Sequence, residues 1–240
     1  MPLSITRNAE FAGVNVIGKR IFDLSLVATM PQSSRLHTFV KEVADRARPL
    51  GYHVLPAEQM HVTVINPLFM MEKESGGFTD VQRVMFETPE EQRMLFAGFN
   101  SVVMKMADEG LFDNELTLSA SDVLFRPRDL KVLMPANAQW KAMLGSLEER
   151  LKSNSPWFDF LEGPPLLQRN GTDYVHATVL RFPMDIDAAK HEALLGIVED
   201  EAGKVCEDLM FKVSRQNLLI VMFTGLFEPW VREASLIRST

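Results

Sequence analysis

The 240-residue sequence has a single cysteine, Cys206, and no long hydrophobic run. One thiol excludes both an intrachain disulfide framework and a zinc site built on several thiolates. No stretch approaches the roughly 18 apolar residues that indicate a membrane span. Arg7, Asn8 and Glu10 interrupt the N-terminal segment, where a signal peptide needs a continuous apolar core. We therefore expect a cytoplasmic protein that does not associate with a membrane.

Positive charge is also scarce, because 25 Lys and Arg face 32 Asp and Glu, for a formal net charge of −7. Tight binding to long duplex nucleic acid requires the neutralisation of many phosphates, so this balance argues against it. A local basic patch can still outweigh the overall sign, which leaves a small nucleotide or an RNA end as a partner. With 46% hydrophobic and 24% charged residues, the chain has the composition of a globular protein. We expect one compact monomeric domain over residues 1–240.

The first half of the chain shows alternating strand and helix signals. A β-prone run ends at Met30-Pro31, and an apolar stripe at helical spacing follows Ser33 and Ser34. Asn66-Pro67 is expected to end a later strand, and the polar segment 72–80 to form a loop. The expected elements are a strand at 21–28, a helix with the stripe Leu36, Phe39, Val40 and Val43, strands at 52–55 and 60–65, and a helix at 89–108.

The second half shows the same alternation, again with a strand that ends in Met-Pro and precedes a helix. Pro183 is expected to stop a strand that begins at Tyr174. The expected elements are strands at 115–125 and 131–134, a helix at 138–151, a strand at 174–182, a helix at 186–206, and strands at 209–213, 218–224 and 230–237.

The two halves therefore share one order: strand, Met-Pro, helix, His-x-Thr strand, helix, strand. This order predicts an internal duplication, with His61 and His176 at matching places. Two copies are too few for a solenoid, which favours two similar lobes that face each other. We predict an α+β fold with two antiparallel-sheet lobes, outer helices and a central groove. The approximate lobes are 15–110 and 111–240, with elements free to exchange between them.

Each half carries one His-x-Thr motif on a predicted strand: His61-Val62-Thr63-Val64 and His176-Ala177-Thr178-Val179. Side chains alternate along a strand, so the imidazole and the hydroxyl of each motif share one face while the apolar residues take the other. A single motif of this kind is more often structural than catalytic. The second copy, in the same strand context, favours catalysis.

Two imidazoles that meet in a groove suit phosphodiester chemistry. One neutral imidazole takes a proton from the attacking oxygen, and a protonated one supplies a proton to the departing oxygen. The hydroxyls of Thr63 and Thr178 can donate to the non-bridging phosphate oxygens, where negative charge accumulates. This scheme uses no metal and no cofactor. It does not decide which of His61 and His176 is the acid. The active protonation state is expected to be most populated at a pH close to the ordinary histidine pKa of about 6.5.

On these motifs the sequence resembles the two-histidine (2H) phosphoesterase superfamily, which includes RNA ligase-like proteins and cyclic nucleotide phosphodiesterases. The resemblance implies a hydrolase that acts on 2′,3′-cyclic phosphates or related nucleotide and RNA-end phosphodiesters. In many members the second motif continues to an arginine, and Arg181 stands at that place here. By strict alternation Arg181 shares the face of Ala177, so it reaches the groove only if the strand twists or bulges.

Further candidates are weighed against simpler interpretations. Tyr174 lies on the face of His176 and is a candidate to stack on a base, with ordinary packing as the alternative. Arg126, Arg128 and Lys131 form the most basic short segment, for which a solvated hairpin turn is the simpler interpretation. Three other histidines are expected to be structural or solvated: His37, His53 and His191.

Three alternatives remain open. One is a module that binds nucleotides or RNA ends without turnover, and the second is a metal-dependent phosphoesterase. The third is a structural or interaction domain in which the two motifs are coincidental. The sequence has no HExxH motif and no close cluster of histidine and aspartate with metal-ligand spacing. Metal-independent catalysis is therefore the preferred hypothesis.

Overall fold

The computed structural model describes residues 3–7, 21–71, 89–154, 173–183, 187–223 and 231–235. No helix in these ranges is both long enough and apolar enough to cross a membrane. The helices are α1 (Arg35–Ala47), α3 (Pro89–Asp108), α4 (Ala138–Asn154) and α6 (Ala188–Gly203), with 3₁₀ turns η1 (Arg48–Leu50), η2 (Ala57–Gln59) and η3 (Arg215–Asn217). The strands are β1 (Ser4–Arg7), β2 (Ile21–Thr29), β3 (His53–Val54), β4 (His61–Met71), β5 (Leu116–Ser119), β6 (Asp122–Phe125), β7 (Asp129–Pro135), β8 (Tyr174–Arg181), β9 (Met210–Val213), β10 (Leu218–Phe223) and β11 (Val231–Ser235).

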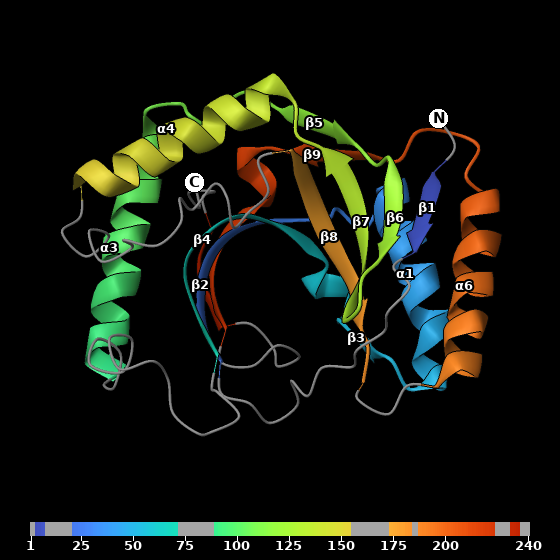
Figure 1. Ribbon diagram of the computed structural model, residues 1–240. Helices are drawn as coiled ribbons and strands as arrows, with labels where there is room; N and C mark the ends of the chain where they lie inside the picture. The colour runs from blue at the N-terminus through green and yellow to red at the C-terminus, as the bar shows by residue number, and fades with distance from the viewer. Residues whose placement is uncertain are drawn as a thin grey trace.

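Most strands belong to one large curved sheet, with the order β1-β6-β7-β8-β4-β2-β10-β11 and with β3 beside β8. Neighbours are antiparallel except β1 and β6, and β5 pairs with β9 in a separate ribbon. In Figure 1, α1 and α6 lie side by side next to β6–β8, while α4 crosses the end of α3 on the other side of the molecule. The predicted α+β class is confirmed. The sheets of the two halves meet edge to edge at β4 and β8.

The topology repeats about this junction, with an exchange of strands. In the first half β2, α1, β4 and α3 lead to β6, and in the second β7, α4, β8 and α6 lead to β10. One strand of each half crosses over, because β6 of the first half pairs with β7 and β10 of the second half pairs with β2. The helices cross over in the same way, since α1 contacts α6 and α3 contacts α4. An internal duplication remains a prediction, but the repeated order of elements is observed.

The strands depart from the predicted pattern in three places. β4 continues through Asn66-Pro67 to Met71, because these two residues lie where the β2–β4 register shifts, and a proline at a bulge costs no ladder hydrogen bond. The expected strand 115–125 is split into β5 and β6, which belong to different sheets. β1 was not predicted, and the expected loop 72–80 lies outside the described residues.

The helices pack against one face of the sheet. Ser34 caps α1 by accepting a hydrogen bond from the His37 backbone N–H, and the predicted stripe of α1 is buried. This stripe belongs to one hydrophobic core that also contains Val62 of β4, Ala177 of β8 and Trp140 of α4. The apolar residues of the two His-x-Thr strands therefore anchor the motifs, and their imidazoles project from the opposite face.

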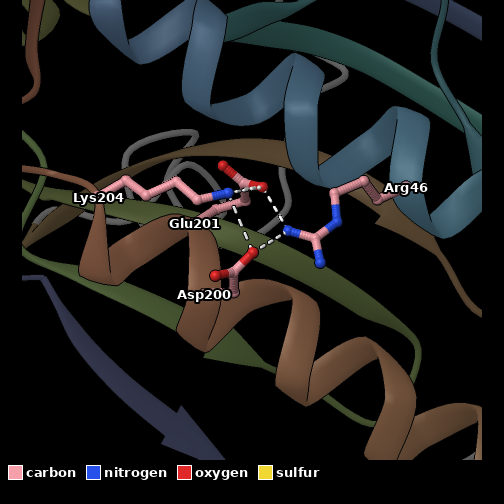
Figure 2. A network of polar contacts seen from close by, with 4 residues as sticks. All are labelled: Arg46, Asp200, Glu201 and Lys204. Atoms are coloured by element: carbon pink, nitrogen blue, oxygen red, sulfur yellow. Dashed lines mark hydrogen bonds and ion pairs between the residues drawn. The ribbon is translucent and has the colours of Figure 1, made fainter.

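A four-residue ionic network links α1 to α6 (Figure 2). The Arg46 guanidinium donates to Glu201 at 2.5 Å and also to Asp200, and Lys204 bridges the same two carboxylates at 2.9 and 3.0 Å. Glu201 is buried, and burial raises the pKa of its carboxyl, but the hydrogen bonds from Lys204 and Arg46 outweigh this effect and lower it overall. Arg46 is the member of the network that comes from α1.

We predict that Arg46→Met lowers the midpoint of thermal unfolding, because Glu201 loses one of its two cations at the α1–α6 contact. The matched control is Arg48→Met, whose charge lies 3.7 Å from Asp45 close by in the sequence. Scanning calorimetry of both variants at pH 7 checks this. Equal midpoints for Arg46→Met and wild type would show that the network contributes nothing to helix docking.

Candidate active site

The two His-x-Thr motifs meet at the junction of the two sheet halves. Val62 of β4 pairs directly with Ala177 of β8 in antiparallel register. Continuing this register by one residue in each direction sets His61 opposite Thr178 and Thr63 opposite His176. Adjacent strands are only about 5 Å apart, so the four side chains form one compact group.

All four motif side chains share one face of the sheet. Val62 and Ala177 are fully buried on the helix side, whereas His61, Thr63, His176 and Thr178 are half-buried on the other side. The sequence prediction that the two motifs converge is met by a direct strand pairing. We call this face, with the side chains of β4, β7 and β8 that project from it, the histidine face.

Both motifs are followed by a bulge. The β2–β4 register shifts around Val64 and the β7–β8 register shifts around Val179. In each strand two successive residues are then buried, Val64 with Ile65 and Val179 with Leu180. A bulge reverses the facing of the residues beyond it. Arg181 is thereby returned to the histidine face, which is the condition under which the sequence predicted that it could reach the site.

The first bulge does the same for Asn66, which stands in β4 at the place that Arg181 occupies in β8. Asn66 is half-buried. The two bulges thus place an amide at the end of the first motif, where the second motif ends in a guanidinium.

His61 is oriented by its own backbone. Its Nδ1–H donates to the Gln59 carbonyl at 2.7 Å, which puts the lone pair of the neutral ring on Nε2. Burial lowers the pKa of His61 to about 4, against the opposing effect of the Gln59 carbonyl and with a further contribution from the Arg181 charge. At neutral pH His61 is therefore an uncharged proton acceptor.

His176 contacts a lysine that projects from the neighbouring strand. The Lys131 ammonium lies 3.0 Å from His176 Nε2 and donates to it. Lys131 pairs with Thr178 across β7 and β8, so it shares the histidine face. Burial, followed by the positive charges of Lys131 and Arg126, lowers the pKa of His176 to about 3.

Three cations surround a single carboxylate next to the histidines. Asp129 is 6% exposed, and its oxygens lie 3.7 Å from Lys131 Nζ, 3.9 Å from Arg181 Nη1 and 4.0 Å from Arg126 Nε. In these contacts between described residues, three positive charges share one negative charge. Such a local excess, within a chain of net charge −7, favours an anionic ligand.

Both histidines are neutral at pH 7 in the free protein, because both pKa values lie far below 7. The prediction of one charged and one neutral imidazole concerns the reacting complex and stays a prediction. The positive charge near the site is instead on Lys131, Arg126 and Arg181. Sequence reasoning missed Lys131 and Asp129 as site residues. The available signal was the basic segment 126–131, for which a solvated turn is the simpler interpretation.

The other predicted residues take different places. Tyr174 is 50% exposed on β8, with the strand parity of His176, and its ring is accessible for stacking on a ligand. His37 is structural, because its Nε2 bonds the Ala57 carbonyl at 3.1 Å, and His191 packs edge-on against Phe182. His53 pairs with Arg181 and so lies beside the site. Across the described ranges, no group of three or more His, Cys, Asp or Glu side chains is positioned to hold a metal ion.

Comparisons with known proteins support the fold. No family model matches the chain, and no curated protein is similar to it in sequence. A conserved protein of unknown function from Agrobacterium tumefaciens strain C58 is similar in structure, with 10% identity, a TM-score of 0.54 and coverage of 91% of this chain and 87% of that one. Two structures of Usb1 from Kluyveromyces marxianus, one of them with uridine monophosphate, show 10% and 11% identity at a TM-score of 0.40, over 89% of this chain and 98% of theirs. The first of these similarities shows a shared fold.

The low pKa values of the two histidines also predict the acid sensitivity of the fold. Both rings stay neutral in the folded state, at pKa values of about 4 and 3, while in the unfolded chain they take up a proton below about 6.5. The unfolded state then binds more protons. The contribution of the two histidines to the free energy of unfolding is therefore fully present above about pH 6.5 and is lost as the pH falls towards about 4. The expected slope is at most about 1.4 kcal/mol per pH unit for each histidine.

The measurement is urea unfolding at several pH values between 7 and 4 for wild type and for His61→Gln/His176→Gln. We expect the double variant to show a shallower loss of unfolding free energy over this interval, because glutamine does not titrate. Parallel curves for the two proteins would place the acid sensitivity elsewhere.

Proposed function

We propose that the protein is a metal-independent phosphodiesterase that hydrolyses 2′,3′-cyclic phosphates or related phosphodiesters of nucleotides and RNA ends. The observation that carries this proposal is the pairing of two His-x-Thr motifs on adjacent strands, next to an excess of cations. The motifs supply two imidazoles and two hydroxyls on one face. Lys131, Arg126 and Arg181 supply the charge that attracts a phosphodiester anion.

The geometry favours His61 as the base. Its lone pair is on Nε2, because the Gln59 carbonyl fixes the tautomer. As an oxygen nucleophile attacks phosphorus, its proton passes to His61 Nε2, and the leaving oxygen receives a proton at the His176 end of the site. Thr63 and Thr178 are placed to donate hydrogen bonds to the non-bridging oxygens, where charge increases in the transition state. Tyr174 is proposed to stack on the nucleobase of the substrate, and Arg181 to contact the phosphate.

The first test of function is the removal of each imidazole. We expect His61→Ala and His176→Ala each to lower kcat for a 2′,3′-cyclic nucleotide by about 10²–10⁴-fold, the usual contribution of a positioned acid or base. His191→Gln is the control, because His191 is buried among aromatic rings and takes no part in the proposed chemistry. All rates are expressed per folded molecule, and activity is expected to persist in excess EDTA.

Near-normal turnover in either folded histidine variant would contradict the two-imidazole mechanism. Loss of wild-type activity in EDTA with recovery on metal addition would support the metal-dependent alternative. Binding of cyclic nucleotides without turnover by wild type would support the alternative of a binding module.

The second test addresses the hydroxyls. Thr63→Val and Thr178→Val remove one hydrogen-bond donor each at nearly constant volume. We expect each to raise the activation free energy by about 1–3 kcal/mol, less than the histidine variants, with a small effect on KM. Steady-state kinetics on the same substrate checks this, and unchanged kcat in both variants would show that the hydroxyls do not contact the phosphate.

A further inference from the structure

Lys131 occupies an unusual place for a lysine. It is only 8% exposed, although lysine is rarely buried without a full ionic partner. Its ammonium is 3.0 Å from His176 Nε2 and 3.7 Å from Asp129 Oδ2. Asp129 is shared with Arg126 and Arg181, so it neutralises Lys131 only in part. Among the described residues, the closest polar partner of this buried ammonium is therefore an imidazole on which the proposed reaction depends.

We propose that Lys131 and His176 act as one proton-donating pair, in which Lys131 carries the positive charge and supplies the proton that reaches the leaving oxygen. This inference rests on the proposed function and makes Lys131 a catalytic residue of that reaction. It also assigns direction to the site, with His61 as the base on β4 and the pair as the acid on β7 and β8.

The protons and electrons of this step balance. The attacking oxygen forms a bond to phosphorus and gives its proton to His61 Nε2, while the bond from phosphorus to the leaving oxygen breaks and its electron pair stays on that oxygen. The Lys131–His176 pair transfers one proton to the leaving oxygen and becomes neutral. His61 ends as an imidazolium, and solvent then returns both groups to their starting states. No metal or co-reactant other than the attacking hydroxyl or water is required.

The charges that face Lys131 come from three elements. Asp129 lies on the same strand, Arg126 at the turn between β6 and β7, and His176 and Arg181 on β8. Burial lowers the pKa of Lys131 to about 8, with Asp129 opposing and the two arginines adding to the effect. Lys131 is therefore protonated at neutral pH and still able to release its proton, as a general acid requires.

The kinetic experiment compares Lys131→Met and Lys131→Arg with wild type on a 2′,3′-cyclic nucleotide from pH 4 to 10. In wild type, kcat/KM is expected to rise as His61 loses its proton near pH 4 and to fall as Lys131 loses its own near pH 8. Arginine keeps the charge but does not release its proton within this pH range. We therefore expect Lys131→Arg to retain KM, to lose kcat by about 10²–10³-fold and to lack the alkaline limb. Lys131→Met is expected to lose kcat and to raise KM.

The control is Lys212→Met, a lysine that pairs with Glu115 at the surface, and it is expected to match wild type. A Lys131→Arg enzyme with wild-type kcat would overturn the proton-donor role while leaving the proposed function intact. An alkaline limb that persists in Lys131→Arg would overturn it equally.

A second measurement is independent of turnover. NMR titration of the histidine rings should show a higher pKa for His176 in Lys131→Met than in wild type, because the neighbouring cation that lowers it has been removed. An unchanged pKa of His176 would overturn the pair whatever the kinetics show. If wild type shows no turnover but the pKa of His176 is raised in Lys131→Met, the contact between Lys131 and His176 is confirmed. The phosphodiesterase function and the donor role are then both rejected.

Discussion

The site depends on the pairing of β4 with β8. Val62 and Ala177 are buried opposite each other, and their pairing joins the β1-β6-β7-β8 part of the sheet to the β4-β2-β10-β11 part. The apolar side chains of both strands pack against the helices. Because side chains alternate along a strand, the imidazoles and hydroxyls must then project from the opposite face. The hydrophobic core therefore sets the relative positions of groups that lie 115 residues apart in the sequence.

The placement of charge results from the same pairing. Side chains on one face of adjacent antiparallel strands are close neighbours, so a lysine on β7 opposite Thr178 must lie beside His176. Burial keeps both imidazoles neutral, with a further contribution from the charge of Arg181 at His61 and from the charges of Lys131, Arg126 and Arg181 at His176. The histidine face is thus positively charged through its lysine and arginines and not through its histidines.

Much of this arrangement could be predicted from the sequence. The period of two in the His-x-Thr segments predicted which residues share a face, and the repeated order of elements predicted the correspondence between β4 and β8. The sequence did not reveal the exchange of β6 and β10 between the halves, because long-range strand pairing leaves no local pattern. The low pKa of His176 in the free protein was not evident from the sequence for a related reason: it depends on burial and on Lys131, 45 residues away. The condition under which Arg181 reaches the histidine face, a bulge in its strand, is met in β8. Strand propensities alone do not locate such a bulge.

The exchange of strands has a consequence for the order in which the chain is made. β2 is completed on one side by β4, which is synthesised soon after it, but on the other side only by β10, which is synthesised after both motifs. Until β10 leaves the ribosome, β2 has an open edge with unpaired backbone groups, the feature that makes nascent β-proteins prone to aggregate. A truncated chain that ends before β10 would therefore carry both motifs but leave the edge of β2 unprotected.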